Sequence, residues 1–574
     1  SVQGGSGSGS GVWIASGRNN QLTVNAGGSL SALSGVAVRY DGKDAASGAM
    51  LRVDNYGRFQ GSAVCGNSDG SQACDVQNHK GGVLSGALVY NAKIDNDGLI
   101  VIGNTGGFEP LVVSGDLRQS ESGTLRSDVD FRNMVSSQMI VQGDADLAGR
   151  LDVMPHALLP NRELAVLTVQ GERRGALEAV DSPVFDYEVR QEGRQALVRV
   201  ASVDFDAASM ELDEHQKRIA SHLQSAWDKE GAALAPLFGQ LDQASRQGAD
   251  AYRERVTDLS PGVAAAPAVQ SAANLAQFTH AMMSCPGFTG VDAMTGERNC
   301  FWGQVSSRWT SQDGHRGAAA FDYDTVTYQF GGQHEIRPGW FLGGSAAYES
   351  SRLNSSDSRN RGDGDSGYVG VVLKRQEGPW VFSAAVGGGY GSYDMKRRMG
   401  IAGHQSVFDS SPDVYGFNAR LRAARTFVYD NFYVKPYVDL DAGYTRMPGY
   451  EESGSNPLAL SVEGGDQFIV GLSPMIEVGG RAQLENGMVL RPYMYAGVSL
   501  SSRDEWSSRA RLRGAPADVA AFNTVLPFDD VVGKVGVGLD VMRHSGMDLR
   551  LQYDGRFSSR MRSHSATLKL VVPF

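Results

Sequence analysis

Four cysteines are the residues whose spacing most directly suggests chemistry, because they fall into two close pairs. Cys65 and Cys74 flank a polar, turn-rich stretch, and Cys285 and Cys300 form the second pair. An even number of cysteines in local pairs favours disulfides and an oxidising compartment. A metal site would call for CxxC spacing or neighbouring histidines, and His79 stands alone near the first pair. Two local disulfides are therefore the favoured interpretation, and metal binding or free thiols are the alternative.

The sequence lacks the motifs of common enzyme classes. It contains no GxSxG, HExxH or P-loop pattern, and its ten histidines are scattered singly. The glycine- and serine-rich segment 4–11 has the wrong spacing for a nucleophile elbow and is typical of a flexible linker. We therefore expect no catalytic residue, no metal ion and no cofactor in this chain.

Charge and hydropathy argue against two broad classes of protein. The 574 residues include 53 Lys and Arg against 64 Asp and Glu, and the formal net charge of −11 argues against a general nucleic-acid binder. The sequence has no stretch of about 18 apolar residues, so a membrane-spanning helix is not expected. A membrane β-barrel stays compatible with this composition, because only alternate residues of its strands are apolar.

The chain shows such an alternation from about residue 300 onward. In residues 547–557 the odd positions are apolar apart from Gly555, and the even positions are charged residues or an amide. Inward charges are tolerated where that face meets water, as in the lumen of a wide barrel. The residues expected to face the lumen are Lys435, Asp439, Asp441, Arg491, Lys534 and Arg550.

Short and long connections alternate between these strands. Tight turns are expected at 337–339, 377–379, 429–431, 485–487 and 544–546, and long polar loops at 353–366, 396–412, 447–466 and 503–530. This alternation is typical of outer-membrane barrels, which have an even number of strands. We predict twelve strands, which start near Phe301, Asp322, Trp340, Gly367, Trp380, Val407, Phe432, Gln467, Met488, Val531, Met547 and Ser563.

Aromatic residues collect near the predicted strand ends, as the girdles at a membrane interface require. They are Trp309, Trp340, Phe341, Trp380, Phe427, Phe432, Phe557 and Phe574.

The N-terminal part has a different pattern. Residues 1–110 contain short apolar segments that run into Asn, Asp or Gly corners, such as Leu51 to Gly57. Closely spaced corners favour a parallel β-helix, in which each rung stacks on the next, and an irregular β-sandwich is the alternative. In residues 111–203 the strands lengthen. Because the open end of a β-helix must be covered, we expect a cap there.

From about residue 204 the apolar period becomes that of a helix. Leu212, Ile219, Leu223 and Ala226 would share one helix face. Pro267 then opens a slim, almost uncharged helix that runs to about residue 284. Such a helix could be an ordinary core helix, or it could fill a narrow tube through uncharged contacts with Ser, Gln and Tyr.

This order of elements resembles the monomeric autotransporters of type V secretion. The most specific stretches are the C-terminal Leu568-Lys569-Leu570-Val571-Val572-Pro573-Phe574, the segment 549–555, and Cys300-Phe301-Trp302-Gly303-Gln304. The resemblance implies an all-β fold with an α-helical linker. Its parts would be a β-helical stem (1–110), a pertactin-like cap or autochaperone region (111–203), a linker with a pore-plugging helix (204–284) and a twelve-stranded barrel (285–574).

The resemblance also implies roles for individual residues. Leu570, Val572 and Phe574 would form the signal that the barrel-assembly machinery reads, and Asn274, Gln277 and Phe278 would belong to the helix in the pore. Some relatives cut themselves in this helix at paired asparagines. Asn274 stands alone, so this route of self-cleavage is not expected.

As a function, the resemblance implies a monomeric barrel in the Gram-negative outer membrane that exports and displays its own passenger, of the adhesin or virulence-factor type. Its partners would be outer-membrane lipid and lipopolysaccharide, the barrel-assembly machinery, periplasmic chaperones and a ligand on the host surface. Two alternatives stay open. One is a surface-anchored protease or esterase with its catalytic domain before Ser1 or a site at the barrel rim, and the other is a passive porin.

Overall fold

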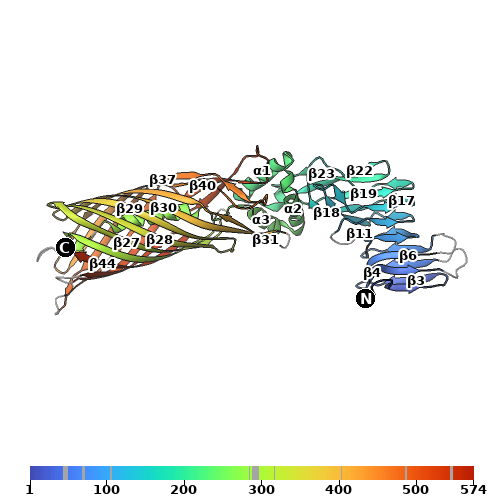
Figure 1. The fold of residues 1–574 in the computed structure, drawn as a ribbon, viewed down its shortest axis with the longest axis horizontal. Coiled ribbons are helices and arrows are strands. Elements are labelled where there is room, and N and C mark those ends of the chain that lie inside the picture. Colours follow the sequence, from blue (N-terminus) through green and yellow to red (C-terminus); the bar gives the residue numbers. More distant parts are fainter. Residues whose placement is uncertain are drawn as a thin grey trace. The chain divides into compact units, whose positions relative to one another are not determined.

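In the computed structural model, the described residues are 1–42, 50–66, 72–103, 107–283, 285–287, 296–315, 317–401, 404–484, 488–542 and 547–574. They form two compact units, one of residues 1–212, 220–256 and 514–519 and the other of residues 213–219, 257–513 and 520–574. Figure 1 shows a stack of short strands in the first unit and a barrel of long strands in the second. The predicted fold class, a β-helix and a twelve-stranded barrel joined by helices, is confirmed.

The first unit is a parallel β-helix. One face stacks seven strands: β3 (Asn20–Val24), β5 (Leu51–Asn55), β7 (Cys74–Asn78), β10 (Ala92–Asn96), β13 (Leu117–Gln119), β17 (Ala145–Leu147) and β20 (Arg173–Gly175). The larger sheet holds β1 (Val2–Gly4), β2 (Val12–Ile14), β4 (Ser29–Tyr40), β6 (Arg58–Cys65), β8 (Val83–Gly86), β9 (Leu88–Tyr90), β11 (Leu99–Ile102), β12 (Leu111–Val113), β14 (Thr124–Asp130), β15 (Val135–Ser136), β16 (Met139–Val141), β18 (Arg150–Ala157), β19 (Leu164–Val169) and β21 (Glu178–Val180).

Parallel pairing continues across residue 110 as far as β20 and β21. The pattern changes at β22 (Phe185–Glu192) and β23 (Gln195–Val203), an antiparallel hairpin that pairs with β19. An antiparallel hairpin ends the stacking of rungs and occupies the hydrogen-bonding edge of β19. Stacked parallel rungs also exclude the alternative of an irregular β-sandwich.

A ladder of buried amides runs through the β-helix. Asn55 donates through Nδ2 to Asn78 Oδ1 at 2.7 Å, Asn78 donates to Asn96 at 2.7 Å, and Asn96 donates to Gln119 at 2.9 Å. These four residues end successive strands and are paired in register. Each side chain is at most 2% exposed. Because each amide both donates and accepts, the ladder satisfies buried polar groups that the corners would otherwise leave unpaired.

We expect Asn78→Ala to destabilise the β-helix by roughly 2–4 kcal/mol. The substitution removes two buried hydrogen bonds, the one that Asn78 accepts from Asn55 Nδ2 and the one that it donates to Asn96 Oδ1. Urea unfolding of the detergent-solubilised chain measures this loss, with the exposed Asn25 replaced by Ala as the control. Equal stability of the two variants would contradict a structural role for the ladder.

The helical segment contains α1 (Glu214–Asp228), α2 (Ala235–Gln247), α3 (Ala249–Thr257) and α4 (Ala266–Ala281), with short 3-10 turns at Ala208–Met210 and Ala232–Leu234. Ile219, Leu223 and Ala226 of α1 are buried, as the spacing predicts. Pro267 lies in the first turn of α4, where its missing N–H has no helical partner to lose. No helix in the described part of the chain is both long and apolar enough to span a bilayer.

The second unit is a closed antiparallel barrel. Its twelve strands are β26 (Cys300–Gln312), β27 (Phe321–Arg337), β28 (Trp340–Ser355), β29 (Asn360–Glu377), β30 (Trp380–Ile401), β32 (Asp413–Arg425), β34 (Phe432–Met447), β37 (Gly465–Gly480), β39 (Val489–Ser501), β42 (Val531–Met542), β43 (Asp548–Phe557) and β44 (Met561–Pro573). The last strand pairs with the first along its whole length, from Met561 opposite Gln312 to Pro573 opposite Cys300.

Several segments expected to be long loops are strands instead. The connection at 353–366 is reduced to residues 356–359, and the segment 396–412 is an extension of β30 that pairs with β31 (His404–Ser410). The segments 447–466 and 503–530 contribute β35 (Tyr450–Glu451), β36 (Leu460–Val462), β40 (Glu505–Leu512) and β41 (Phe522–Pro527) to one small sheet. A strand outside lipid needs no apolar face. The polar sequence of these segments was therefore wrongly interpreted as loop.

Short strands complete the barrel's ends. They are β24 (Pro286–Gly287) with β25 (Gly296–Glu297), β33 (Phe427–Tyr429) beside β34, and β38 (Ala482–Gln483) beside β39. The tight turns at 337–339, 377–379 and 429–431 lie between strands as predicted, whereas 485–487 and 544–546 lie outside the described residues.

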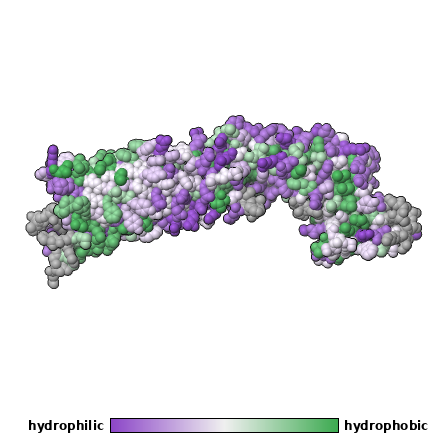
Figure 2. All heavy atoms as spheres, in the orientation of Figure 1, coloured by the Kyte–Doolittle hydropathy of each residue, from purple (hydrophilic) through white to green (hydrophobic). Residues whose placement is uncertain are grey.

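The outer face of the barrel carries the apolar half of the alternation. Figure 2 shows apolar side chains gathered over the barrel end where the C-terminus lies, whereas its opposite end is hydrophilic. Leu551 is 50% exposed, while its neighbour Arg550 points into the barrel and bonds Asp540. Of the predicted girdle residues all are exposed except Phe341, which is buried because it directly follows the outward-facing Trp340.

Candidate functional site

Helix α4 lies inside the barrel. Its apolar residues Leu275 and Phe278, with Met282 just beyond its end, pack in one buried cluster with inward-facing residues of the wall, among them Tyr368 of β29 and Ala385 of β30. The alternation along the wall strands explains this contact, because Val369 and Val371 on either side of the inward position 370 are exposed on the outer face. We call α4 the plug helix.

Three glycines form a notch in the wall where the plug helix rests. A Cβ atom on Gly370 would lie 2.9 Å from both Phe278 and Met282, and one on Gly387 would lie 3.1 Å from Thr279. Gly370 and Gly387 are opposite each other on β29 and β30, and Gly416 on β32 lies against Leu275 in the same way. These close approaches require glycine, so the wall is shaped to the helix.

Charged wall residues also hold the plug helix. Arg308 of β26 donates to Asn274 Oδ1 at 2.5 Å, and Asn274 Nδ2 donates to Glu349 Oε1 of β28 at 2.6 Å. The expectation that the helix makes only uncharged contacts is therefore wrong. A neutral amide can accept from an arginine and donate to a carboxylate at once, which a charged residue cannot do.

The C-terminal half of the plug helix has further anchors. Arg422 Nη2 lies 2.9 Å from His280 Nδ1, Asn418 donates to Thr279 Oγ1 at 2.9 Å, and Gln329 donates to the Phe278 carbonyl at 3.2 Å. Gln277 faces away from this contact and lines the open side of the lumen. The three predicted pore-helix residues thus have different surroundings: Asn274 is bonded, Phe278 is packed, and Gln277 meets the cavity.

The lumen wall carries a ladder of cross-strand ion pairs. Asp540 of β42 accepts from Arg491 of β39 at 2.5 Å and from Arg550 of β43 at 2.7 Å, and each arginine is its register partner. Asp439 and Asp441 accept from Arg422 and Arg420 of the neighbouring strand β32.

The remaining predicted lumen residues, Lys435 and Lys534, contact Glu477 at 3.9 Å and Ser473 at 3.3 Å. The residues that complete the network, Arg308, Glu349, Arg420, Arg422, Glu477 and Asp540, were not predicted from the sequence. Their inward positions follow from the alternation, but their partners depend on strand register, which no single strand reveals.

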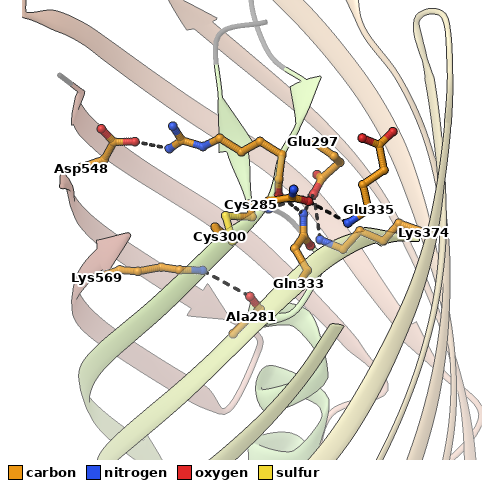
Figure 3. Close-up of a disulfide and its surroundings, with 11 residues drawn as sticks. Ala281, Cys285, Glu297, Cys300, Gln333, Glu335, Lys374, Asp548 and Lys569 are labelled. Atoms are coloured by element: carbon orange, nitrogen blue, oxygen red, sulfur yellow. Dashed lines mark hydrogen bonds and ion pairs between the residues drawn. A yellow bond between two sulfur atoms is a disulfide. The ribbon is translucent and has the colours of Figure 1, made fainter. Parts of the chain in front are cut away.

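A second cluster closes the barrel where the chain passes from the plug helix to β26 (Figure 3). Cys285 and Cys300 form a disulfide there, and Glu297 accepts from buried Lys374 at 2.9 Å and from Gln333 at 2.8 Å. Arg298 bonds Asp548 of β43. Lys569 Nζ reaches the carbonyl of Ala281 at the end of the plug helix. This closing cluster ties Glu297 and Arg298, which just precede β26, to strands on both sides of that first strand.

The other predicted sites lie elsewhere in the two units. Cys65 and Cys74 form a disulfide that joins β6 to β7 in the β-helix, and part of the loop between them lies outside the described residues. Leu570 and Val572 face outward on β44, and Phe574, directly after that strand, is exposed as well. Phe574 stacks on Phe301 of β26 with ring centres 4.7 Å apart, so the end of the chain seals the seam between the first and last strands.

The plug helix runs from one end of the barrel to the other. Near its start, Ala266 and Ala268 pack with Leu353, Met395 and Trp506, which lie beside the long connections. Beyond its end lies the closing cluster, next to the start of β26 and the C-terminus. In outer-membrane barrels the short turns face the periplasm and the long connections face outward. The direction of α4 is therefore from the outer end of the lumen to the periplasmic end.

Comparison with known families identifies the barrel. Residues 301–554 match the family model described as the autotransporter beta-domain. The match covers 254 of the 574 residues, less than half of the chain, and all of them lie in the barrel. It agrees with an outer-membrane location of the barrel.

Solved structures of autotransporter barrels are also similar to this chain. The translocator domain of NalP from Neisseria meningitidis has 13% identity and a TM-score of 0.41, covering 54% of this chain and 97% of that one. The beta domain of the Bordetella autotransporter Brka has 15% identity and a TM-score of 0.36, covering 48% of this chain and all of that one.

Two curated proteins show a partial sequence match. Esterase EstA of Pseudomonas aeruginosa and Esterase EstA of Pseudomonas putida are each 26% identical over 155 residues, which is 26% of this chain. The match spans 24% of each esterase, so this chain covers about a quarter of the length of the curated relatives it matches. Within the described residues, no group of three or more His, Cys, Asp or Glu could hold a metal ion.

We expect Gly387→Val to loosen the plug helix and to raise the frequency of open-pore events about tenfold, because the added methyls would strain the contact with Phe278 and Thr279 by roughly 1–3 kcal/mol. Single-channel recording in planar bilayers measures these events. Gly388→Val is the matched control, since a Cβ at this neighbouring position would lie 3.7 Å from its nearest neighbour, the Gly416 carbonyl oxygen. Equal gating by both variants would contradict the notch.

Proposed function

We propose that this chain exports and displays its own N-terminal part. The barrel inserts in the outer membrane, the lumen serves as the passage, and the segment that precedes the plug helix stays at the cell surface. The observation that supports this most strongly is the direction of α4. Because the chain enters the lumen at the outer end and leaves at the periplasmic end, everything before residue 266 emerges on the outer side.

The proposed division of labour follows the chain. Residues 1–110 act as a β-helical stem, residues 111–203 as the cap where folding outside begins, residues 204–284 as linker and plug, and residues 285–574 as the translocator. Folding of the stem outside would oppose backward movement, because a strand hydrogen-bonded to both neighbours does not slide back. The closing cluster and the plug helix would then seal the empty passage.

Other parts of the proposal concern partners. The outward face of β44, with Leu570, Val572 and Phe574, is suited to recognition by the barrel-assembly machinery, because these side chains are exposed before lipid covers them. Periplasmic chaperones would hold the chain unfolded until insertion, and lipopolysaccharide would surround the outer leaflet end. A host ligand of the stem, as for an adhesin, is the remaining partner.

Protease treatment of intact cells tests the direction of display. We expect an added protease to remove residues before the plug helix while the barrel fragment and a periplasmic marker protein both survive. The connection between the β-helix and the plug helix is the expected region of cleavage, and mass spectrometry of the surviving fragment locates it. Protection of the β-helix until the outer membrane is broken would contradict surface display.

A second candidate is a surface-anchored esterase or protease. The partial match to Esterase EstA favours an ester-hydrolysing passenger, with a catalytic domain before Ser1. Hydrolysis of a p-nitrophenyl ester by cells that display the complete gene product, but not by cells that display this chain, would support the second candidate. Hydrolysis by this chain alone would instead place the active site within it.

A further inference from the structure

The lumen holds a cavity of about 230 Å³ on the open side of the plug helix. It is bounded by α4 residues such as Gln270 and Gln277 and by inward side chains of strands on the far wall, from β34 to β44 and β26. This volume exceeds the space that one water needs, so the cavity has room for a small solute with its hydration. Its lining combines small and apolar residues of the plug helix and the wall with charged and hydroxyl side chains of the wall strands.

Two cations lie side by side on the wall of this cavity. Lys534 of β42 and Arg556 of β43 are register partners, and both line the cavity. Like charges directly opposite on neighbouring strands are destabilising. The pairs Arg491–Asp540 and Arg420–Asp441 on the same wall combine opposite charges instead.

Neither cation has a carboxylate partner in the described part of the chain. The polar contact of Lys534 is the neutral hydroxyl of Ser473 at 3.3 Å. Arg556 makes no ion pair with a described carboxylate, and its buried Nε has no hydrogen-bond partner there. A buried N–H without an acceptor is destabilising, so an anion that accepted a hydrogen bond from it would stabilise this arrangement.

Arg420 is a third cation at the same cavity. Arg420 is 4% exposed and lines the cavity, and its Nε and Nη2 bond Asp441. Its Nη1 has no hydrogen-bond partner among the described residues, and the nearest carboxylate oxygen, Asp439 Oδ2, lies 4.0 Å away. Arg420 lies within electrostatic reach of both Lys534 and Arg556. Three positive groups therefore surround one volume, each with donor capacity left over.

Four of the five acidic residues that line the cavity are bonded to other side chains. Asp441 accepts two bonds from Arg420, Asp439 accepts two from Arg422, and Asp529 accepts from Arg560. Asp554 accepts from Tyr495 and from Gln552. Asp530 is the fifth acidic residue of the lining. Among the described residues, no ion pair joins any of these five carboxylates to Lys534 or Arg556.

We propose that this cavity is a binding site for a small oxyanion, held by Lys534, Arg556 and the Nη1 group of Arg420. An oxyanion offers several acceptor oxygens at once, which suits a guanidinium, an ammonium and the neighbouring hydroxyls of Ser473 and Ser565. The bound anion would convert a repulsive cross-strand pair into a bridge between β42 and β43. Binding would therefore stabilise the barrel. The proposal rests on the barrel geometry and not on the direction of export.

Inorganic phosphate is the probe for the test. Calorimetric titration of the folded chain in detergent, against chloride at matched ionic strength, measures binding. We expect phosphate to bind the native chain, and Lys534→Gln and Arg556→Gln each to weaken binding at least about tenfold. Both variants should also unfold at a higher temperature than the native chain when no phosphate is present, because the like-charge contact is gone.

Lys569→Gln is the matched control. Lys569 also lies opposite an arginine, Arg550, in the wall, but its ammonium is placed over the Trp302 ring and donates to the Ala281 carbonyl. We expect this variant to retain phosphate binding within about twofold. The absence of binding to the native chain, or an equal loss in Lys569→Gln, would overturn the proposal. Heat-modified mobility in gels confirms for each variant that the barrel is folded.

Discussion

The structure depends on one constraint, which is that a chain in lipid must satisfy its own backbone hydrogen bonds. A β-sheet meets this requirement only when it has no free edge. Here the edge is removed by the pairing of β26 with β44 from one end to the other. The stacking of Phe574 on Phe301 and the disulfide at Cys300 both lie at this seam, so the chain's last residue and its first barrel residue reinforce the same closure.

Closure creates an interior that must be wet or filled, and this barrel uses both solutions. On one side, the plug helix fills the lumen and fits a notch of glycines. On the other side, cross-strand ion pairs line a cavity that water can reach. Asn274 links the two, because it bridges Arg308 and Glu349 of the wall while its neighbour Leu275 packs on Gly416. The helix is therefore held in the lumen by specific contacts with the wall.

The barrel could be predicted from the sequence because contact with lipid requires an apolar side chain at every second position of a strand. The outward direction of Leu551 and the inward direction of Arg550 can be predicted from the alternation of their own strand, without knowledge of any neighbouring strand. The same logic failed above the membrane, where β29 begins at Asn360 and not near Gly367, and β32 begins at Asp413 and not near Val407. Strands there are surrounded by water on both faces and lack the apolar signal.

Contacts within the lumen could be predicted only in part. Asp439 and Lys534 were expected to face inward from alternation alone, but their partners are set by register and by the position of the plug helix. The notch is a clear example, since Gly370 and Gly387 look ordinary in a glycine-rich chain until the helix is placed against them. The amide ladder from Asn55 to Gln119 was hidden in the same way, because unequal rung lengths obscure its spacing.

The most direct test of this account is the environment of two adjacent residues of β43, Leu551 and Gln552. Each is replaced by cysteine, spin-labelled, and studied in lipid vesicles by electron paramagnetic resonance with oxygen and a nickel complex as relaxing agents. We predict high access to oxygen and low access to nickel at position 551, and the loss of this lipid signature at position 552. The same signature at both positions, or a dry and immobile environment at position 551, would contradict a lipid-embedded barrel with a wet lumen.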